Sequence, residues 1–287
     1  MENYIIMTDS TTDLPISYIK EKGLNVIPLG YTIDGKNYID NHELSSSEFF
    51  QKIKQGYVAK TFQINPEQFY EEFKKVLSKG IGILGIFFSS GLSGTFNSAR
   101  IARDQILEEM PNAKIEIVDS LCASLGEGLL VHYATLAKES GMSLEENKKY
   151  IEQLKLKVSH WFTVMDMDTL KRGGRISAGA AFFAKTLNIN PILHVSNEGK
   201  LVAKTKKIGR KSALNALIDK VLENYIPEEN KTIFISHSNS LDEANKIAEV
   251  IKAKTTVKDV LVNEIGPVIG GHCGVGTIAI FFVSAKR

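Results

Sequence analysis

The sequence predicts an α/β protein of two domains, an N-terminal layered α/β domain with a largely parallel sheet and a C-terminal α+β domain. In the first half, short apolar runs end in small polar residues and are each followed by a helical pattern, which is typical of buried parallel strands. Near residue 159 the pattern changes to a hairpin, helices and strands in mixed order. We therefore expect domains over residues 1–158 and 159–287.

The first half contains three expected strands, each followed by an expected helix. The strands are YIIMTDS from residue 4, GILGIFFSS from residue 82 and IEIVDS from residue 115. The helices are PISYIKEKG, GTFNSARIARDQILEEM and GEGLLVHYATLAKES. In the second helix, Ile101, Ile106 and Leu107 form one apolar face, as expected for a helix that packs on a sheet. A charged helix, EENKKYIEQLKLKVSH, ends the first half.

The second half begins with a strand, WFTVMDM, and a helix over AGAAFFAKTLN. The segment ILHVSNEGKLVAKTKKI is expected to form a hairpin that turns at residues 197–199. A helix KSALNALIDKVLENY, a strand TIFISHS, a helix LDEANKIAEVIKA and two closing strands follow. Because the chain has no repeat or long linker, we expect the two halves to pack together and leave a cleft.

Composition excludes several classes of protein. The chain has 35 Lys and Arg against 33 Asp and Glu, and this net charge of +2 gives no overall field for binding nucleic acid or an anionic membrane. Two cysteines form no disulfide framework, and the first residues lack the pattern of a secretory signal. No apolar run approaches the roughly 20 residues of a membrane span. We expect a cytoplasmic protein without an integral membrane segment.

Polar clusters follow three expected strands: TDSTTD at 8–13, SSGLSGT at 89–95 and DSLCAS at 119–124. Ligands of open α/β sheets bind beyond the carboxyl ends of the strands, so a site is expected there. Ser, Thr and Asp are also the preferred N-cap residues of helices. For TDSTTD, capping by Asp13 or Thr12 and ligand contact both remain open, whereas for DSLCAS capping is favoured.

The SSGLSGT segment has more hydroxyls than one helix cap needs. Gly91 and Gly94 allow close backbone approach, so amides and hydroxyls can converge on an anion at the helix N-terminus. The anion is not expected to be a nucleotide phosphate, because neither G-x-x-x-x-G-K-[ST] nor G-x-G-x-x-G occurs. Ser93 lies in GLSGT, which does not match the G-x-S-x-G pattern of a serine hydrolase.

Metal chemistry finds little support, because H-E-x-x-H, C-x-x-C and close His pairs are missing, and Asp166 and Asp168 fit a helix cap as well as Mg²⁺. We expect no metal and no cofactor. Near the end of the chain, GPVIGGHCGVGTIAIFF predicts a glycine-rich loop around His272 and Cys273. There His272 offers an N–H, or a positive charge when protonated, to a carboxylate. A structural histidine is the alternative.

These motifs together resemble the DegV family of bacterial fatty-acid-binding proteins, and the resemblance runs nearly from end to end. It is carried by TDSTTDLP, SSGLSGTFNSA, VDS, DTLKRGGRIS, PIL and GPVIGGHCGVGTIAI. The resemblance implies a carrier of two α/β domains that holds one long-chain fatty acid between them in a tunnel. It also implies that Thr61 and Ser93 grip the carboxylate, that the Gly94 amide faces it and that His272 lies near. The stretch after Thr61 departs from the family pattern at Phe62 and at residues 64–65.

The resemblance further implies a partner, an ATP-dependent fatty acid kinase that converts the presented carboxylate into an acyl phosphate, so that the carrier itself is not an enzyme. Exposed Lys171, Arg172 and Arg175, with Arg210, are candidates for docking this partner. For LKRGGR a helix end with a glycine stop is the alternative. Two rival functions remain open. One is an acyl hydrolase or transferase that uses Ser93 and His272, and the other is a lipid-sensing regulator.

Overall fold

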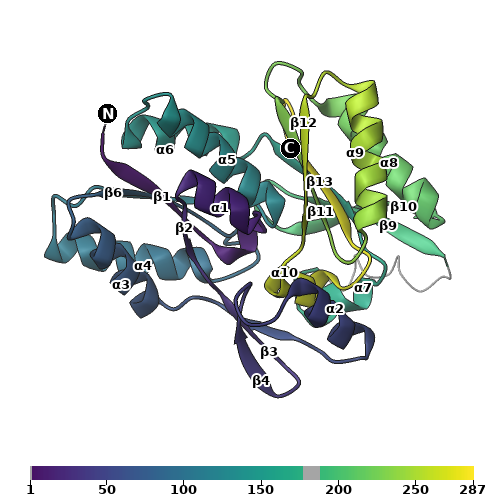
Figure 1. Ribbon diagram of the computed structural model, residues 1–287, viewed down its shortest axis with the longest axis horizontal. Coiled ribbons are helices and arrows are strands. Elements are labelled where there is room, and N and C mark those ends of the chain that lie inside the picture. The colour runs from purple at the N-terminus through teal and green to yellow at the C-terminus, as the bar shows by residue number, and fades with distance from the viewer. Residues whose placement is uncertain (1, 177–187) are drawn as a thin grey trace.

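The N-terminal sheet is entirely parallel, as the sequence predicts, with the strand order β2-β1-β6-β7. The computed structural model describes residues 2–176 and 188–287. The strands of this sheet are β1 (Tyr4–Asp9), β2 (Asn25–Ile27), β6 (Gly82–Phe87) and β7 (Ile115–Asp119). Its helices are α1 (Ile16–Lys22), α3 (Pro66–Leu77), α4 (Thr95–Glu109), α5 (Leu125–Glu139) and α6 (Leu144–Leu154). Figure 1 shows α3 and α4 on one face of the sheet and α5 and α6 on the other.

A small antiparallel sheet with the order β4-β3-β5 lies between β2 and α3 in the chain. It consists of β3 (Gly30–Ile33), β4 (Lys36–Ile39) and β5 (Lys60–Phe62), with α2 (Ser46–Lys54) inserted before β5. No sheet was expected here from the sequence, because strands of three or four residues are too short to display the alternating pattern of a strand. The small sheet brings Thr61 into contact with the C-terminal half of the molecule.

The C-terminal sheet is mixed and has six strands in the order β10-β9-β8-β13-β11-β12. Its strands are β8 (Val158–Thr163), β9 (Ile189–Val195), β10 (Leu201–Ile208), β11 (Thr232–His237), β12 (Asp259–Glu264) and β13 (Ile278–Val283). Its helices are α7 (Met167–Arg172), α8 (Arg210–Asn224), α9 (Leu241–Lys254) and α10 (Pro267–Cys273). Among these six described strands only β11 and β12 pair in parallel, so the α+β character expected for this half is confirmed.

Helix α5 is the element around which the two halves pack. It contacts β1 and β6 of the N-terminal sheet and also β8, β11 and β13 of the C-terminal sheet. Eleven of its 15 residues are buried, which agrees with the apolar sequence GLLVHYATLA. The larger core cluster accordingly continues from Ile6 and Leu84 in one half to Phe162 and Phe281 in the other. A second cluster lies under α8 and α9.

Most expected elements are present, with several corrections. The expected helix EENKKYIEQLKLKVSH ends at Leu154, because its last three residues belong to β8, and the expected strand WFTVMDM ends at Thr163, before α7. Ile101 is 42% exposed while Ile106 is fully buried, so the apolar face of α4 does not include Ile101. The glycine-rich segment after residue 265 is not a loop, because its first part forms the short helix α10, with Pro267 at the first helical turn. The hairpin turn at residues 197–199 is confirmed by the register of β9 with β10. The expected helix over AGAAFFAKTLN falls on residues 177–187, outside the described residues.

The SSGLSGT loop meets the C-terminal half at the β9–β10 hairpin. The Ser89 hydroxyl donates to the Gly199 carbonyl at 2.8 Å. A Cβ added to Gly91 would lie 2.5 Å from the Glu198 carbonyl oxygen, and backbone cannot move aside as cheaply as a flexible side chain. Close packing against the hairpin therefore requires glycine at position 91.

Replacing Gly91 by alanine is expected to lower the free energy of unfolding by about 1–3 kcal/mol, because the added methyl overpacks the contact between the loop and the hairpin. The melting temperature measures the loss. Ser90→Ala, one residue away and exposed, is the control and should change stability by less than about 0.5 kcal/mol. Equal melting temperatures for Gly91→Ala and Ser90→Ala would contradict the packing described here.

Candidate functional site

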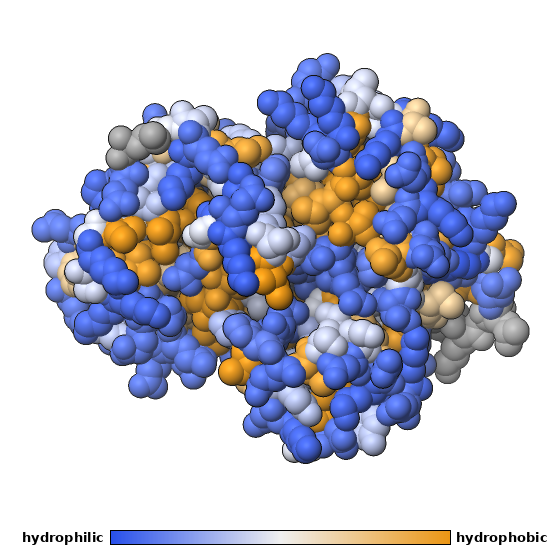
Figure 2. Space-filling model, in the orientation of Figure 1, coloured by the Kyte–Doolittle hydropathy of each residue, from blue (hydrophilic) through white to orange (hydrophobic). Residues whose placement is uncertain are grey.

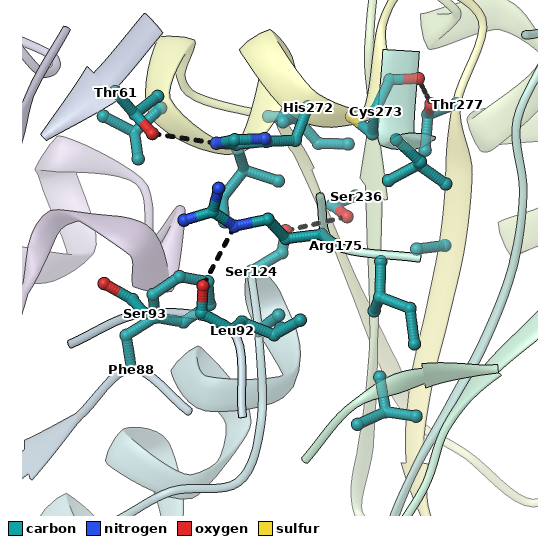
Figure 3. Close-up of a pocket in the computed structure, with 18 of the residues that line it drawn as sticks. Thr61, Phe88, Leu92, Ser93, Ser124, Arg175, Ser236, His272, Cys273 and Thr277 are labelled. Carbon is teal, nitrogen blue, oxygen red and sulfur yellow. Dashed lines mark hydrogen bonds between the residues drawn. The ribbon is translucent and has the colours of Figure 1, made fainter. Parts of the chain in front are cut away.

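A cavity of about 320 Å³ lies between the two halves and is lined mainly by apolar side chains. The N-terminal half contributes Leu29, Phe62, Phe88 and Leu92, and the C-terminal half contributes Phe162, Leu170, Val195, Leu201, Ile265, Val268, Ile269, Ala279 and Phe281. Polar side chains line it in two places, one around Thr61 and His272 and the other around Ser124 and Ser236 (Figure 3). The cavity is of the size and character of a small-molecule site.

The polar group around Thr61 and His272 is formed by four segments of the chain. Thr61 on β5 and His272 on α10 share a hydrogen bond of 2.8 Å between Oγ1 and Nε2. Ser93 lies at the start of α4, and Arg175 follows α7 and donates from Nε to the Leu92 carbonyl at 3.0 Å. Figure 3 shows the Arg175 guanidinium directed to the side of the cavity where Thr61, His272 and Ser93 lie. The structure thus brings together three of the four residues expected to hold a carboxylate.

His272 is held in its neutral form. Burial, and to a lesser extent the charge of Arg175, lowers the pKa of the imidazole to about 4. Nδ1 is buried and makes no hydrogen bond to any described residue. A Cβ on Gly173 would lie 2.2 Å from this nitrogen, so glycine is needed there for the ring to fit. A buried polar atom without a partner is costly, and a ligand or a water molecule would relieve that cost.

Ser93 and Gly94 differ in their relation to the cavity. The Ser93 hydroxyl lines it, accepts the Thr95 N–H at 3.2 Å and bonds to the Thr95 hydroxyl at 2.9 Å. Gly94 is the N-cap of α4 but is not among the lining residues. A Cβ at Gly94 would lie 2.2 Å from the side-chain oxygen of Gln63, so here glycine admits the Gln63 amide.

The three arginines proposed for partner docking do not form one exposed cluster. Arg172 is exposed, but Arg175 is half-buried at the cavity, and Arg210 makes an ion pair with Glu243 at 2.6 Å. The expectation that Arg175 is exposed was therefore wrong. LKRGGR also ends a helix, because α7 ends there with Gly174 at a φ of 70°, and this does not test a docking role.

Ser93 and His272 are not arranged as a nucleophile and its base. Within the described residues, Nε2 of His272 bonds to Thr61 and Nδ1 to nothing, whereas the Ser93 hydroxyl bonds to Thr95. A catalytic serine would instead be hydrogen-bonded to the imidazole, which a third group would orient.

The other two strand ends have different roles from those expected. No residue of TDSTTD lines the cavity, and Asp13 ends the short 3-10 turn over Ser10–Thr12 rather than capping α1. Ser124 is the N-cap residue of α5 but makes no capping bond, so the cap favoured for DSLCAS was wrong. Its hydroxyl donates instead to Asp13 Oδ2 at 2.5 Å and lies 3.0 Å from the Ser236 hydroxyl.

Sequence reasoning missed Gln63, Ser236 and the inward position of Arg175, and for Ser124 it favoured a helix cap over the cavity. Gln63 and Arg175 stand within motifs that were recognised, at positions whose direction the chain pattern does not specify. Ser236 lies inside β11, where a polar residue in the apolar run TIFISH was the available signal.

On the face shown in Figure 2, hydrophilic side chains predominate and hydrophobic ones form separate patches. In residues 2–176 and 188–287 no helix has the length and apolar character to cross a bilayer. The same residues contain no group of three or more His, Cys, Asp or Glu side chains that could hold a metal ion.

Comparison with known proteins shows similarity over the whole length of the chain. A family model described as the DegV family matches residues 3–285. A DegV domain-containing protein of Clostridium perfringens is 44% identical, with 100% of this chain and 99% of the relative covered.

Two solved structures are also similar. A DegV family protein from Thermus thermophilus, described as binding fatty acid, is 33% identical, with a TM-score of 0.88 and 98% of this chain and 99% of that chain covered. DegV from Bacillus subtilis, described as a fatty acid binding protein, is 28% identical, with a TM-score of 0.85 and 99% of this chain and 100% of that chain covered.

The buried carboxyl group of Asp40 is expected to make stability depend on pH. Burial raises its pKa from 3.8 to about 7, so between these values the folded protein keeps a proton that the unfolded chain releases. Its contribution to stability is therefore lost as the pH rises through about 7. Asp40→Asn should gain melting temperature relative to the wild type between pH 5 and pH 8, by about 2 °C or more.

The effect of Asp40 is isolated by the difference in melting temperature between Asp40→Asn and the wild type at each pH. Buried histidines such as His272 have a lowered pKa, so below neutral pH they make the stability of the wild type rise with pH, which is the opposite direction. Asp259→Asn, at an exposed carboxyl group, is the control. If the melting-temperature difference from wild type is as independent of pH for Asp40→Asn as it is for Asp259→Asn, the raised pKa of Asp40 is contradicted.

Proposed function

This chain belongs to the DegV family, and on that premise we propose that it binds one long-chain fatty acid in the cavity between its two halves. The observation that carries the proposal is the distribution of polarity in the cavity. Its lining is mainly apolar, and a cation, an imidazole and two hydroxyls gather at one place. The fatty acid binding of the Thermus thermophilus and Bacillus subtilis proteins supports it.

The acyl tail supplies most of the affinity in this proposal. Each buried methylene contributes about 0.8 kcal/mol, so the tail of a sixteen-carbon acid outweighs the few hydrogen bonds available to its head. The polar group at Thr61 and His272 then fixes the orientation of the chain and excludes lipids without a free acid. Binding sites commonly divide affinity and orientation in this way.

The carboxylate would be held by the hydroxyls of Thr61 and Ser93, with Arg175 beside them and His272 acting through Thr61. The Gly94 amide, which does not line the cavity, is left out of this arrangement. Thr61 can donate its proton to the carboxylate if His272 donates from Nε2 to Thr61, which the 2.8 Å contact permits. The Arg175 guanidinium has carbonyl partners at Leu92 and Gly173, and a carboxylate beside it would compensate its charge. Two hydroxyls and one cation can offset the cost of desolvating the acid.

We further propose that the bound acid is presented to a partner fatty acid kinase in the cytoplasm, which forms the acyl phosphate with ATP. A second cavity of about 770 Å³ shares Thr61, Arg175 and His272 with the first, and is also lined by Lys54, Lys60 and Arg172. A head group bound at Thr61 and His272 would therefore border a basic space on its other side. Such a space suits the approach of a negatively charged phosphoryl donor.

Lipid extracted from the purified protein is expected to contain about one fatty acid per chain by mass spectrometry. The double variant Thr61→Ala, Ser93→Ala should bind a sixteen-carbon acid about tenfold more weakly or worse, because it loses two hydrogen bonds to a charged group. Its melting temperature should change little.

The methyl ester of the same acid should bind equally weakly to wild type and double variant, since it has no carboxylate to hold. Thr32→Ala, on β3 and outside the cavity, is the matched control and should keep full affinity. If no fatty acid is extracted and none binds on addition, the proposed carrier function is wrong. Turnover of an acyl ester would indicate the hydrolase instead.

Arg172→Glu is expected to slow acyl phosphate formation by a partner kinase about tenfold, because it reverses an exposed charge beside the proposed approach path. Its affinity for fatty acid should be unchanged. Arg100→Glu, at an exposed arginine of α4 outside the second cavity, is the control. Equal rates for the two variants would exclude Arg172 from the docking surface.

A further inference from the structure

The TDSTTD turn, residues 8–13, is buried but takes no part in the cavity. Its side chains instead bond to the two segments that carry His272 and Ser93. We propose that this turn positions both: Asp13, together with its neighbour Asp40, positions α10 and so His272, and Asp9 positions the loop that carries Ser93. This inference rests on the proposed function of the cavity and adds the residues that align its two sides.

Helix α10 is attached to the turn through its N-terminal amides. Asp13 Oδ1 accepts the Gly266 N–H at 2.9 Å, and Asp40 Oδ1 accepts the Val268 N–H at 3.1 Å. The other oxygen of Asp40 accepts the Ser10 hydroxyl at 2.7 Å, so Asp40 links α10 to the turn. The first amides of a helix have no partner within it, and here two buried carboxyl groups supply the partners.

The position of α10 determines the position of His272. Val268 and His272 are four residues apart, about one turn of helix, and a helix of seven residues has few backbone bonds of its own. A shift at its start therefore moves the imidazole with it. The Asn263 side chain reinforces the attachment, because its amide donates to the Asp13 carbonyl at 2.7 Å just before the helix begins.

Asp9 makes the corresponding contact on the other side of the cavity. Its Oδ2 accepts the Phe88 N–H at 2.8 Å, and Phe88 lines the cavity immediately before the SSGLSGT loop. Its Oδ1 accepts both the backbone N–H of Thr11 at 3.0 Å and the Thr11 hydroxyl at 2.6 Å. The end of β1 thus fixes the chain that leads from β6 to Ser93.

The turn holds its buried acids in one hydrogen-bonded group with Glu127. The Thr8 hydroxyl donates to the Ile86 carbonyl at 2.7 Å, and the Thr11 hydroxyl lies 2.6 Å from Asp9 Oδ1. Glu127, fully buried on α5, lies 2.9 Å from the Thr11 hydroxyl and 3.3 Å from the Thr8 hydroxyl. Burial raises the pKa of Glu127 well above its ordinary value, which favours the neutral acid, able to donate to one of these hydroxyls. The turn is a complete hydrogen-bonded unit, which suits a rigid positioning element.

The test compares Asp40→Ala with Asn230→Ala. The second variant is expected to lower the melting temperature by a similar amount, but it lies away from α10. Asn230 is buried and bonds to Val283 and Ile226, away from α10. Asp40→Ala is expected to weaken fatty acid binding by about 2-fold to 30-fold. Asn230→Ala is expected to leave the affinity unchanged, although it lowers the melting temperature by a similar amount. Asp40→Asn keeps an acceptor for the Val268 amide and should restore most of the affinity. If Asp40→Ala does not fold, Ser10→Ala, which removes one bond to Asp40, replaces it.

A double-mutant cycle separates positioning from general stability. In the His272→Ala background, Asp40→Ala should cost much less affinity than in the wild type, because the residue through which it acts is gone. Additive losses, or equal losses for Asp40→Ala and Asn230→Ala, would overturn the proposal.

A ligand-free readout keeps this test distinct from that of the proposed function. The NMR signals of the His272 ring should move in Asp40→Ala and stay in place in Asn230→Ala. If these signals move but no fatty acid binds to the wild type, the positioning role stands and the proposed function falls. If they do not move, the positioning role is wrong whatever the protein binds.

Discussion

The cost of burying polar groups governs the junction between the two halves. Around the TDSTTD turn the protein itself offsets the cost of desolvation, because each carboxyl oxygen of Asp9, Asp13 and Asp40 accepts a hydrogen bond from a hydroxyl or a backbone amide. Around His272 it is not met, because one ring nitrogen is buried without a partner in the described chain. The two polar clusters therefore differ in kind. The complete one is structural, and the incomplete one has the character of a binding site.

Helix α5 explains why these clusters lie so close together. It is packed between the two large sheets, and its N-terminal end carries both Ser124 and Glu127. Ser124 reaches the acid network through Asp13 and also lines the cavity beside Ser236. The same short segment thus forms part of the core and part of the site. Its backbone has a φ of 53° at Ser124, an uncommon value for a residue with a side chain, and the surrounding bonds hold it there.

The cavity depends on short elements as well as on large sheets. β5 has three residues and α10 has seven, yet they supply Thr61 and His272, which bond to each other across the small sheet and the C-terminal half. Such elements have little stability of their own, so contacts with their neighbours must fix them. Phe49 and Phe50 of α2 perform this role for α10, where a Cβ on Gly270 would meet the ring of Phe50 at 2.7 Å.

Local sequence determined the parallel N-terminal sheet, the mixed C-terminal half and the hydroxyl-rich loop around Ser93. Strand burial, helix periodicity and turn formation depend on residues that are close together in the sequence. The glycine-rich motif also singled out His272, and the family resemblance singled out Thr61, although 211 positions separate the two. Tertiary structure alone decided that these two meet and that Arg175 faces the cavity. It also decided that Arg210 is paired with Glu243 and that Asp13 of the TDSTTD turn bonds to the start of α10. Each of these facts depends on the direction of a side chain relative to a distant segment, which the local pattern does not encode. The small sheet β4-β3-β5 was not predicted either, because strands of three or four residues are stabilised by the strands they pair with and not by their own sequence.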